Sequence, residues 1–284
     1  MWHGTLDASP EAVTPAEEAR ARAMRSARRR HEFLVCRGAL RRILAGVLDV
    51  DPLAIAILEG AHGKPRLATG PAGPRRPPAV GFNLSHSGGR FVVAVALGME
   101  PGVDVERVRP RRNLARLARR FFSPSERRAV GSAPDPLGAF FRVWARKEAV
   151  IKADGRGVSI GLDRFDVTEG EPAALLEARW EGAAPDEASH WSLHALKSGP
   201  DHAAAVAVRS RSAEVVVRSA LPGSNPPCAR VPLRADPVEE GTRPRSGRDA
   251  PKRHGREVEA GFPGPDPETG PSPIGAPSSA ARNG

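Results

Sequence analysis

The spacing of apolar residues in the first half of the chain predicts one long helix followed by strands. Over residues 16–47, apolar side chains recur at helical spacing beside arginines, which predicts an amphipathic helix. A Gly- and Pro-rich stretch at residues 60–78 then breaks regular structure. The apolar, β-branched run at residues 91–97 predicts a buried strand, and a second strand is expected to begin at Val103.

Helices and strands also interleave in the second half. An arginine-rich helix is expected around residues 114–121, and Ser-Pro-Ser-Glu at residues 123–126 has the form of a capping box that begins another helix. A third helix should run over residues 136–154, between a capping aspartate and a terminating glycine. Further strands are expected at residues 165–167, 191–195, 203–208 and 214–217. The pattern predicts an α+β fold of two lobes of similar size.

The composition indicates a positively charged protein with a disordered C-terminal tail. The chain has 284 residues, 40% of them hydrophobic, which is enough to bury a core. Its formal net charge of +10 indicates an anionic partner, such as nucleic acid, a phosphate-rich cofactor, an acidic protein surface or a membrane face. Residues 222–284 are rich in Pro, Gly, Ser and Arg without apolar periodicity, which predicts a disordered tail.

The number of cysteines and the length of apolar runs indicate where in the cell the protein is expected. The two cysteines, Cys36 and Cys228, are far apart and suggest neither a disulfide framework nor a paired-cysteine zinc site. The N-terminal residues lack the apolar core of a signal peptide, and no run of about 18 apolar residues occurs. We therefore expect a cytoplasmic protein that does not enter a membrane.

Two carboxylates in Gly102-Val103-Asp104-Val105-Glu106 are the first candidates for chemistry. Strand alternation would place the valines on one face and both carboxylates on the other, about 7 Å apart. Mg²⁺ prefers oxygen ligands and completes its shell with water and substrate phosphate, so Asp104, Glu106 and a third carboxylate from Glu148 could bind it. The alternative is a solvated edge strand with alternating polar residues.

Two charges continue the apolar stripe of the helix at residues 136–154. The stripe passes through Phe140 and Trp144 and then reaches Glu148 and Lys152, where apolar residues would be expected. As an exposed pair at i,i+4 spacing, the two charges would only stabilise the helix slightly. Beside the carboxylates of the strand, they become candidates for a charged site.

A polar segment at residues 82–89, Phe-Asn-Leu-Ser-His-Ser-Gly-Gly, is expected to form a turn between apolar stretches. Its two glycines would permit close approach of a ligand, and Ser85 and His86 can donate hydrogen bonds to phosphate. A Ser-His hydrolase is a rival interpretation, although no Gly-x-Ser-x-Gly elbow is present. A loop histidine without a function is the other alternative.

Lys64, in Gly63-Lys64-Pro65, offers a point charge for phosphate on a stiff turn. The segment is not a P-loop, because neither Ser nor Thr follows the lysine. Taken alone, this motif is weak.

Taken together and in order, five segments resemble the Sfp-type 4′-phosphopantetheinyl transferases. They are Gly63-Lys64-Pro65, Phe82 to Gly89, Gly102 to Glu106, Phe121-Phe122-Ser123 and Trp144-Ala145-Arg146-Lys147-Glu148-Ala149-Val150-Ile151-Lys152. The resemblance covers residues 2–221, including the helical segment Phe33 to Arg42, and leaves out the tail. It implies a pseudo-twofold monomer of two α+β lobes with coenzyme A bound in the cleft between them.

The resemblance also implies boundaries and roles. The N-terminal lobe would span residues 1–101, the C-terminal lobe with the metal-binding carboxylates 102–221, and the disordered tail 222–284. By matching position, the metal ligands would be Asp104, Glu106 and Glu148, and the catalytic residues Glu148, Lys152 and Asp104. The coenzyme A contacts would be Lys64, Ser85, His86, Lys152 and Arg37, with Arg28, Arg29 and Arg30 as candidates for the 3′-phosphate.

In the implied reaction, a carrier-protein serine attacks the bridging phosphate of coenzyme A and 3′,5′-ADP leaves, with Mg²⁺ polarising the phosphate. Three carboxylates would repel the cofactor's phosphates unless such a cation intervened. Glu148, directly or through a metal-bound water, would take the serine proton, and Lys152 would neutralise charge on the phosphate or leaving group.

The implied partner is an apo acyl or peptidyl carrier domain, typically an acidic helical bundle, for which a cationic surface is a suitable docking field. The arginines expected to form that surface are Arg109, Arg111, Arg112, Arg116, Arg119 and Arg120; a solvated helix face is the alternative.

Two other function classes stay open. A coenzyme A- or nucleotide-binding protein without catalysis would keep the fold, although all three carboxylates and the lysine are present. The high isoelectric point would also suit a nucleic-acid-binding protein, but the chain has no tyrosine, few other aromatic residues and no recognition motif. We therefore expect no nucleic-acid partner.

Overall fold

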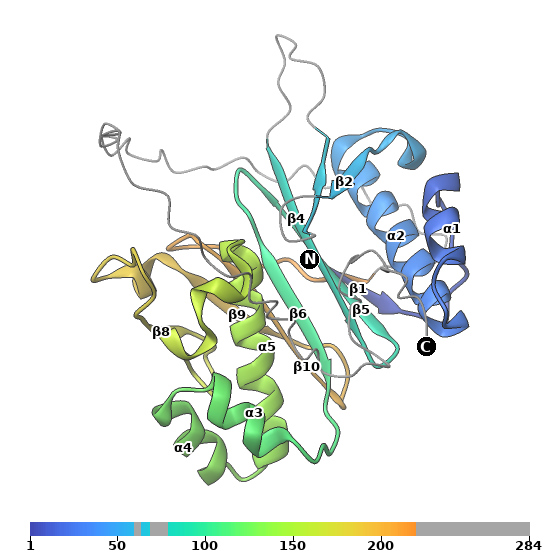
Figure 1. The fold of residues 1–284 in the computed structure, drawn as a ribbon. Helices are drawn as coiled ribbons and strands as arrows, with labels where there is room; N and C mark the ends of the chain where they lie inside the picture. Colours follow the sequence, from blue (N-terminus) through green and yellow to red (C-terminus); the bar gives the residue numbers. More distant parts are fainter. Residues whose placement is uncertain (60–63, 69–78, 220–284) are drawn as a thin grey trace, which may run out of the picture.

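Two sheets, each covered by a long helix, form the framework of the computed structural model (Figure 1). The structure describes residues 1–59, 64–68 and 79–219. The predicted tail at 222–284, most of the predicted break at 60–78, and Gly63 of the first motif lie outside the described residues. The α+β fold of two lobes is confirmed, because each lobe repeats the same arrangement of one long helix on a sheet.

The first lobe contains a four-stranded sheet in the order β11-β1-β5-β4, with helix α2 packed on one face. Neighbouring strands are antiparallel except β11, which runs parallel to β1. The elements are β1 Trp2–Thr5, α1 Pro15–Arg22, α2 Ala27–Leu48, the 3₁₀ turn η1 Pro52–Ala54, β2 Ile57–Glu59, β3 Pro65–Leu67, β4 Val80–Ser87, β5 Arg90–Leu97 and β11 Arg218–Ser219. Leu40 and Leu44 of α2 pack in one core with Phe82 and Phe91 of the sheet.

The second lobe contains a three-stranded antiparallel sheet in the order β6-β10-β9, with helix α5 packed on one face. The elements are β6 Gly102–Arg107, α3 Leu114–Phe121, α4 Pro124–Ser132, α5 Pro136–Asp154, η3 Gly157–Ile160, η4 Leu162–Arg164, β7 Phe165–Val167, β8 Leu175–Ala178, η5 Glu187–His190, β9 Ser192–Leu196 and β10 His202–Val208. An aromatic cluster of Phe122, Phe140 and Trp144 anchors α5, with ring centroids 5.0 to 6.3 Å apart. The boundaries of the lobes at 1–101 and 102–221 stay a prediction.

The predicted ends of helix α5 and the predicted start of helix α4 are confirmed. Helix α5 begins after Asp135, whose carboxylate accepts from the Gly138 N–H at 3.0 Å, and ends at Gly155, which has a left-handed φ of 83°. Helix α4 begins with the predicted capping box between Ser123 and Glu126. Local hydrogen bonding determines both helix ends, so sequence patterns can predict them.

The single helix predicted over residues 16–47 is wrong, because the segment divides into α1 and α2. Thr14 and Glu17 form a capping box at the start of α1, and Ser26 caps α2 by accepting from the Arg29 N–H at 3.4 Å. The Ser26 cap satisfies an amide at the start of a new helix, which allows the chain to change direction between the two.

Two strand predictions also need correction. The predicted turn at residues 82–89 is mostly strand β4, and only Gly88 and Gly89, with φ of 56° and 85°, form the turn to β5. The strand predicted at residues 214–217 is wrong, because these residues are not in a strand and β11 begins only at Arg218. Pairing with β1, which is far away in the sequence, determines where β11 lies.

A third apolar core lies between the lobes and joins the backs of the two sheets. It contains Val92 and Ala94 of β5, Val103 and Val105 of β6, and Val206 of β10. On the sheet edges beside this core, β4 and β6 contact each other, although no backbone ladder joins them within the described residues. Side chains must therefore connect these two strands.

Strand β6 begins directly against helix α5. A Cβ atom at Gly102 would lie 2.0 Å from the Ala149 carbonyl oxygen and 2.3 Å from the Ala153 nitrogen. Only glycine permits this approach. The contact sets the distance between the carboxylates of β6 and the charged residues of α5.

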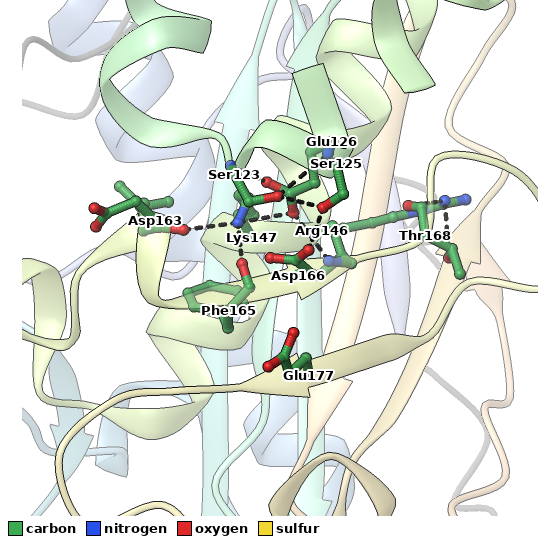
Figure 2. A network of polar contacts seen from close by, with 12 residues as sticks. Ser123, Ser125, Glu126, Arg146, Lys147, Asp163, Phe165, Asp166, Thr168 and Glu177 are labelled. Carbon is green, nitrogen blue, oxygen red and sulfur yellow. Dashed lines mark hydrogen bonds and ion pairs between the residues drawn. The ribbon is translucent and has the colours of Figure 1, made fainter. Parts of the chain in front are cut away.

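A buried polar network holds the other side of α5 (Figure 2). The Lys147 ammonium, which is fully buried, lies 2.8 Å from a carboxylate oxygen of Glu126 and donates to the carbonyls of Leu162 and Phe165 at 2.7 and 2.5 Å. Glu126 in turn accepts from the Ser123 N–H at 2.9 Å. The network ties α5 to the start of α4 and to the segment that enters β7.

No helix in the described part of the chain is both long enough and apolar enough to cross a membrane.

Candidate active site between the two lobes

Strand β6 places two carboxylates on the face of its sheet that helix α5 covers. In the register with β10, Asp104 pairs with Ala205 and Glu106 with Ala203, and these alanines pack in the core around α5. Asp104 and Glu106 are only 3% and 5% exposed, so the alternative of a solvated edge strand is excluded. The predicted alternation is confirmed, because the neighbouring valines lie in the core on the opposite face.

Lys152 of α5 is the cationic partner of Asp104. Its Nζ lies 2.6 Å from Asp104 Oδ1 and 3.3 Å from both the Val103 carbonyl and the Ser85 hydroxyl. Ser85 of β4 donates to the same Oδ1 at 2.8 Å. Three elements from both lobes therefore meet at one carboxylate oxygen.

The second oxygen of Asp104, Oδ2, is buried and has no hydrogen-bond partner among the described residues. A buried carboxylate oxygen without a partner is costly, and such a group usually marks an absent ion or ligand. The unpartnered oxygen is therefore the first structural sign of a cation site.

Glu106 and Glu148 are two further carboxyl groups beside this pair. Burial and the Asp104 charge raise the pKa of Glu106 to about 8, against the opposing effects of Lys152 and the Ser87 hydroxyl. Burial raises the pKa of Glu148 to about 7, with Lys152 lowering it and Asp104 raising it further. If all three groups were ionised, their negative charge would exceed the positive charge of Lys152, and the raised pKa values of Glu106 and Glu148 reflect this imbalance.

The pKa of Lys152 is also raised, but for an ammonium group a higher pKa favours the charged form. Burial alone lowers the pKa of this ammonium, but Asp104, Glu148 and Glu106 together raise it above the ordinary lysine value. Lys152 is therefore protonated at neutral pH and supplies a fixed positive charge at the site.

The donor set suits a divalent cation such as Mg²⁺. Asp104, Glu106 and Glu148 offer hard oxygen ligands, and a bound cation would offset the charge that raises the pKa values of the two glutamates. Within the described ranges, no three His, Cys, Asp or Glu side chains are already placed so that they could hold a metal ion together. The metal ligands therefore stay a prediction that the chemistry of the residues supports.

Two of the predicted coenzyme A contacts lie beside this group. Lys64 donates to the Lys152 carbonyl at 3.0 Å and to Glu100 at 2.9 Å, which places it at the last turn of α5. Ser85 contacts both Asp104 and Lys152, as described above. Both residues therefore border the same charged group.

His86 lies between that group and the start of helix α2. Burial lowers its pKa, Glu32 acts in the opposite sense, and Lys152 and Arg28 lower it further, so charges from both lobes surround the imidazole. Arg28 donates to Glu32 at 2.8 Å within α2. Arg37, further along α2, places its guanidinium over the Phe33 ring at 5.4 Å, and its contact with coenzyme A stays a prediction.

The comparisons with known proteins agree with this geometry. Residues 100–207, which include both strand carboxylates, Glu148 and Lys152, match the family model described as the 4′-phosphopantetheinyl transferase superfamily. Over 220 residues, the chain is 37% identical to the 4′-phosphopantetheinyl transferase HetI of Nostoc sp., covering 73% of this chain and 86% of that protein. The chain belongs to the 4′-phosphopantetheinyl transferase superfamily.

Other members of the superfamily match over shorter segments. The 4′-phosphopantetheinyl transferase of Bacillus subtilis is 34% identical over 139 residues, which cover 48% of this chain and 58% of that protein, less than two thirds of its length. The solved structure of holo-[acyl-carrier-protein] synthase from Neisseria meningitidis aligns with 38% of this chain and 94% of its own, at 20% identity and a TM-score of 0.30. The family predicted from the ordered motifs is confirmed by the longer match to the Nostoc transferase.

Sequence reasoning missed two site residues of this phosphopantetheinyl transferase, Asn83 and Ser87. Asn83 Oδ1 accepts from the Val103 N–H at 3.0 Å, and the Ser87 hydroxyl donates to Glu106 at 3.1 Å. Both share a strand face with Ser85, so the period of two would have identified them had residues 82–87 been interpreted as a strand.

Proposed function

We propose that this protein transfers 4′-phosphopantetheine from coenzyme A to a serine of an apo carrier protein. The observation that carries the proposal is the carboxylate group at the lobe boundary. There Asp104 is paired with Lys152, and its other oxygen is buried without a partner in the described part of the chain. The names of the relatives in the same superfamily support the reaction type. Mg²⁺ and coenzyme A are part of the proposal, as are a monomeric state and a cytoplasmic location.

Asp104, Glu106 and Glu148 are the residues that would hold Mg²⁺. The bound ion would offset their charge and that of the cofactor's diphosphate, which lets the two approach each other. The unpartnered oxygen of Asp104 and the raised pKa of Glu106 support this assignment, because both indicate missing positive charge.

The protein's own groups supply charge and proton transfer. Lys152 is held protonated beside Asp104, so it can stabilise negative charge that develops on the phosphate or the leaving group. Glu148 is half-buried one helical turn earlier, and we assign it to accept the proton of the attacking serine.

Arg28 and His86 are the residues that we assign to the 3′-phosphate. Arg28 is the arginine of its cluster whose charge acts on His86, and more than half of its side chain is exposed. Arg30 instead donates to the Met24 carbonyl at 2.7 Å, which holds it at the start of α2. This contact favours Arg28 over Arg30.

The carrier domain would dock on helix α3. Leu114 and Leu117 pack toward the core of the second lobe, whereas Arg116 and Arg119 of α3 and Arg112 just before it are exposed. An exposed row of arginines is complementary to the acidic surface of a typical carrier domain.

Mass spectrometry tests the proposal directly. Purified protein is incubated with coenzyme A, Mg²⁺ and several apo carrier domains, and each carrier is examined for added phosphopantetheine. Glu148→Gln and Asp104→Asn should abolish the addition, whereas the exposed control Glu181→Gln should leave it unchanged. Binding of coenzyme A without transfer to any carrier would instead support the non-catalytic binding protein.

A further inference from the structure

Ser87, the last residue of β4, is hydrogen-bonded to the second lobe through both its side chain and its backbone. Its hydroxyl donates to Glu106 Oε2 at 3.1 Å and accepts from the Arg107 N–H at 3.2 Å. Its carbonyl accepts from His202 Nε2 at 3.1 Å, since a carbonyl oxygen can only accept. Ser87 is 7% exposed, so these contacts form away from water.

These contacts belong to a ladder of polar side chains that replaces a backbone ladder between β4 and β6. Asn83 accepts from the Val103 N–H, Ser85 donates to Asp104, and Ser87 donates to Glu106. The contacts follow the same order along both strands, so the ladder holds the two edge strands side by side. Each β6 carboxylate is thereby held by a hydroxyl from the other lobe.

The turn that follows Ser87 fixes its position against β6. Gly88 has a φ of 56°, and a Cβ atom there would lie 2.6 Å from the Arg107 Cβ and Cδ. A side chain at residue 88 would push the hairpin away from β6, and the left-handed backbone would be strained as well. The glycine therefore brings Ser87 within reach of Glu106.

Glu106 depends on this hydroxyl more than Asp104 depends on Ser85. Asp104 has the Lys152 ammonium at 2.6 Å, whereas the hydrogen bond that the structure records for the Glu106 carboxylate comes from Ser87. A hydroxyl that donates to a carboxylate stabilises its charged form and restricts its rotation.

From these contacts we infer that Ser87 is a positioning residue that orients the Glu106 carboxylate, across the lobe boundary, toward the divalent cation of the active site. The inference deepens the proposed function and rests on it, because it assumes that Glu106 is a metal ligand. Residues that orient a ligand contribute to metal affinity without touching the metal. Loss of the Ser87 hydroxyl should therefore change metal affinity rather than the rate of the chemical step.

Binding of Mn²⁺, the probe ion, tests this role in the full-length protein. Electron paramagnetic resonance of free Mn²⁺ gives the Kd for the wild type, Ser87→Ala, Ser87→Cys and Ser87→Thr. Loss of the hydroxyl in the alanine and cysteine variants should weaken binding by about 10-fold. Threonine keeps the hydroxyl and should bind Mn²⁺ more tightly than either, and Ser132→Ala, on the exposed end of α4, should match the wild type.

The same variants are assayed for transfer at saturating metal. We expect kcat close to that of the wild type. Only the metal concentration needed for half-maximal rate should rise in the alanine and cysteine variants. Circular dichroism identifies a variant that has not folded. If the alanine variant does not fold, the cysteine variant, which conserves side-chain size, is compared with the wild type instead.

Two results would overturn the inference. One is a Kd for Mn²⁺ in Ser87→Ala and Ser87→Cys within twofold of the wild type, while Glu106→Gln weakens binding; the proposed function would then stand without this role for Ser87. The other is a wild type that transfers phosphopantetheine but does not bind Mn²⁺, which would remove the metal site itself. A wild type that modifies no carrier would instead count against the proposed function.

Discussion

Lys147 and Lys152 lie on the same helix, and the structure predicts that replacing them has opposite consequences. Lys147 is fully buried in the second lobe, where it contacts Glu126 and two backbone carbonyls (Figure 2). Lys152 faces the lobe boundary with about a quarter of its side chain exposed. Lys147→Met should therefore reduce stability and spare the chemical step, whereas Lys152→Met should abolish transfer.

The size of the Lys147→Met effect follows from what the substitution leaves behind. Glu126, whose side chain is 2% exposed, would lose its ion-pair partner at 2.8 Å. Removing one member of a buried ion pair lowers the free energy of unfolding by about 3–5 kcal/mol. Burial already raises the pKa of Glu126, and without the lysine the carboxyl would take up a proton, which limits the loss. For a domain of this size the melting temperature should fall by about 10 °C.

Urea unfolding and thermal melts measure this loss, and a double-mutant cycle with Glu126→Gln separates the pair from the other contacts of Lys147. The coupling between the two substitutions should be at least about 1 kcal/mol. Transfer by Lys147→Met, measured well below its melting temperature, should retain the kcat of the wild type. A destabilisation of less than about 1 kcal/mol, or a lost kcat in a folded variant, would refute the structural role assigned to Lys147.

Three further predictions address the remaining parts of the molecule. Gly102→Ala forces a Cβ atom into the backbone of α5 and should lower the free energy of unfolding by up to about 3 kcal/mol, while Gly131→Ala in α4, with no atom within 4 Å of its Cβ, should be neutral or stabilising in the same urea titration. Hydrogen bonds from Arg209, against the opposing effect of burial, lower the pKa of Glu187 to about 2 from 4.5, so its contribution to stability is present above pH 4.5 and lost as the pH falls toward 2. Glu187→Gln should therefore melt with a weaker pH dependence over that window, and parallel curves would contradict this. Arg116→Glu should raise the KM for the carrier protein and leave the KM for coenzyme A unchanged; an equal change in both would argue against docking on α3.

Much of the second lobe was determined by the sequence alone, because its signals are local. Helix α5 begins and ends at the predicted residues, since Asp135 and Gly155 form hydrogen bonds and a backbone conformation within one turn of the helix. The alternation in β6 correctly separated the carboxylates from the valines. The ordered motifs identified the family, which the match to the Nostoc transferase confirmed.

Only the tertiary structure decided how these pieces meet. Residues 82–87 resemble a polar turn in isolation, and they form a strand because β5 pairs along one edge and the carboxylates of β6 accept hydrogen bonds along the other. Helical spacing singled out Glu148 but gave no sign that its neighbour Lys147, which projects about 100° away on the helix, would be fully buried. The core that forms around α5 places the lysine against Glu126 and leaves the glutamate near the lobe boundary. The neighbours of each of these side chains depend on contacts between segments far apart in the chain, and no local sequence pattern predicts such contacts.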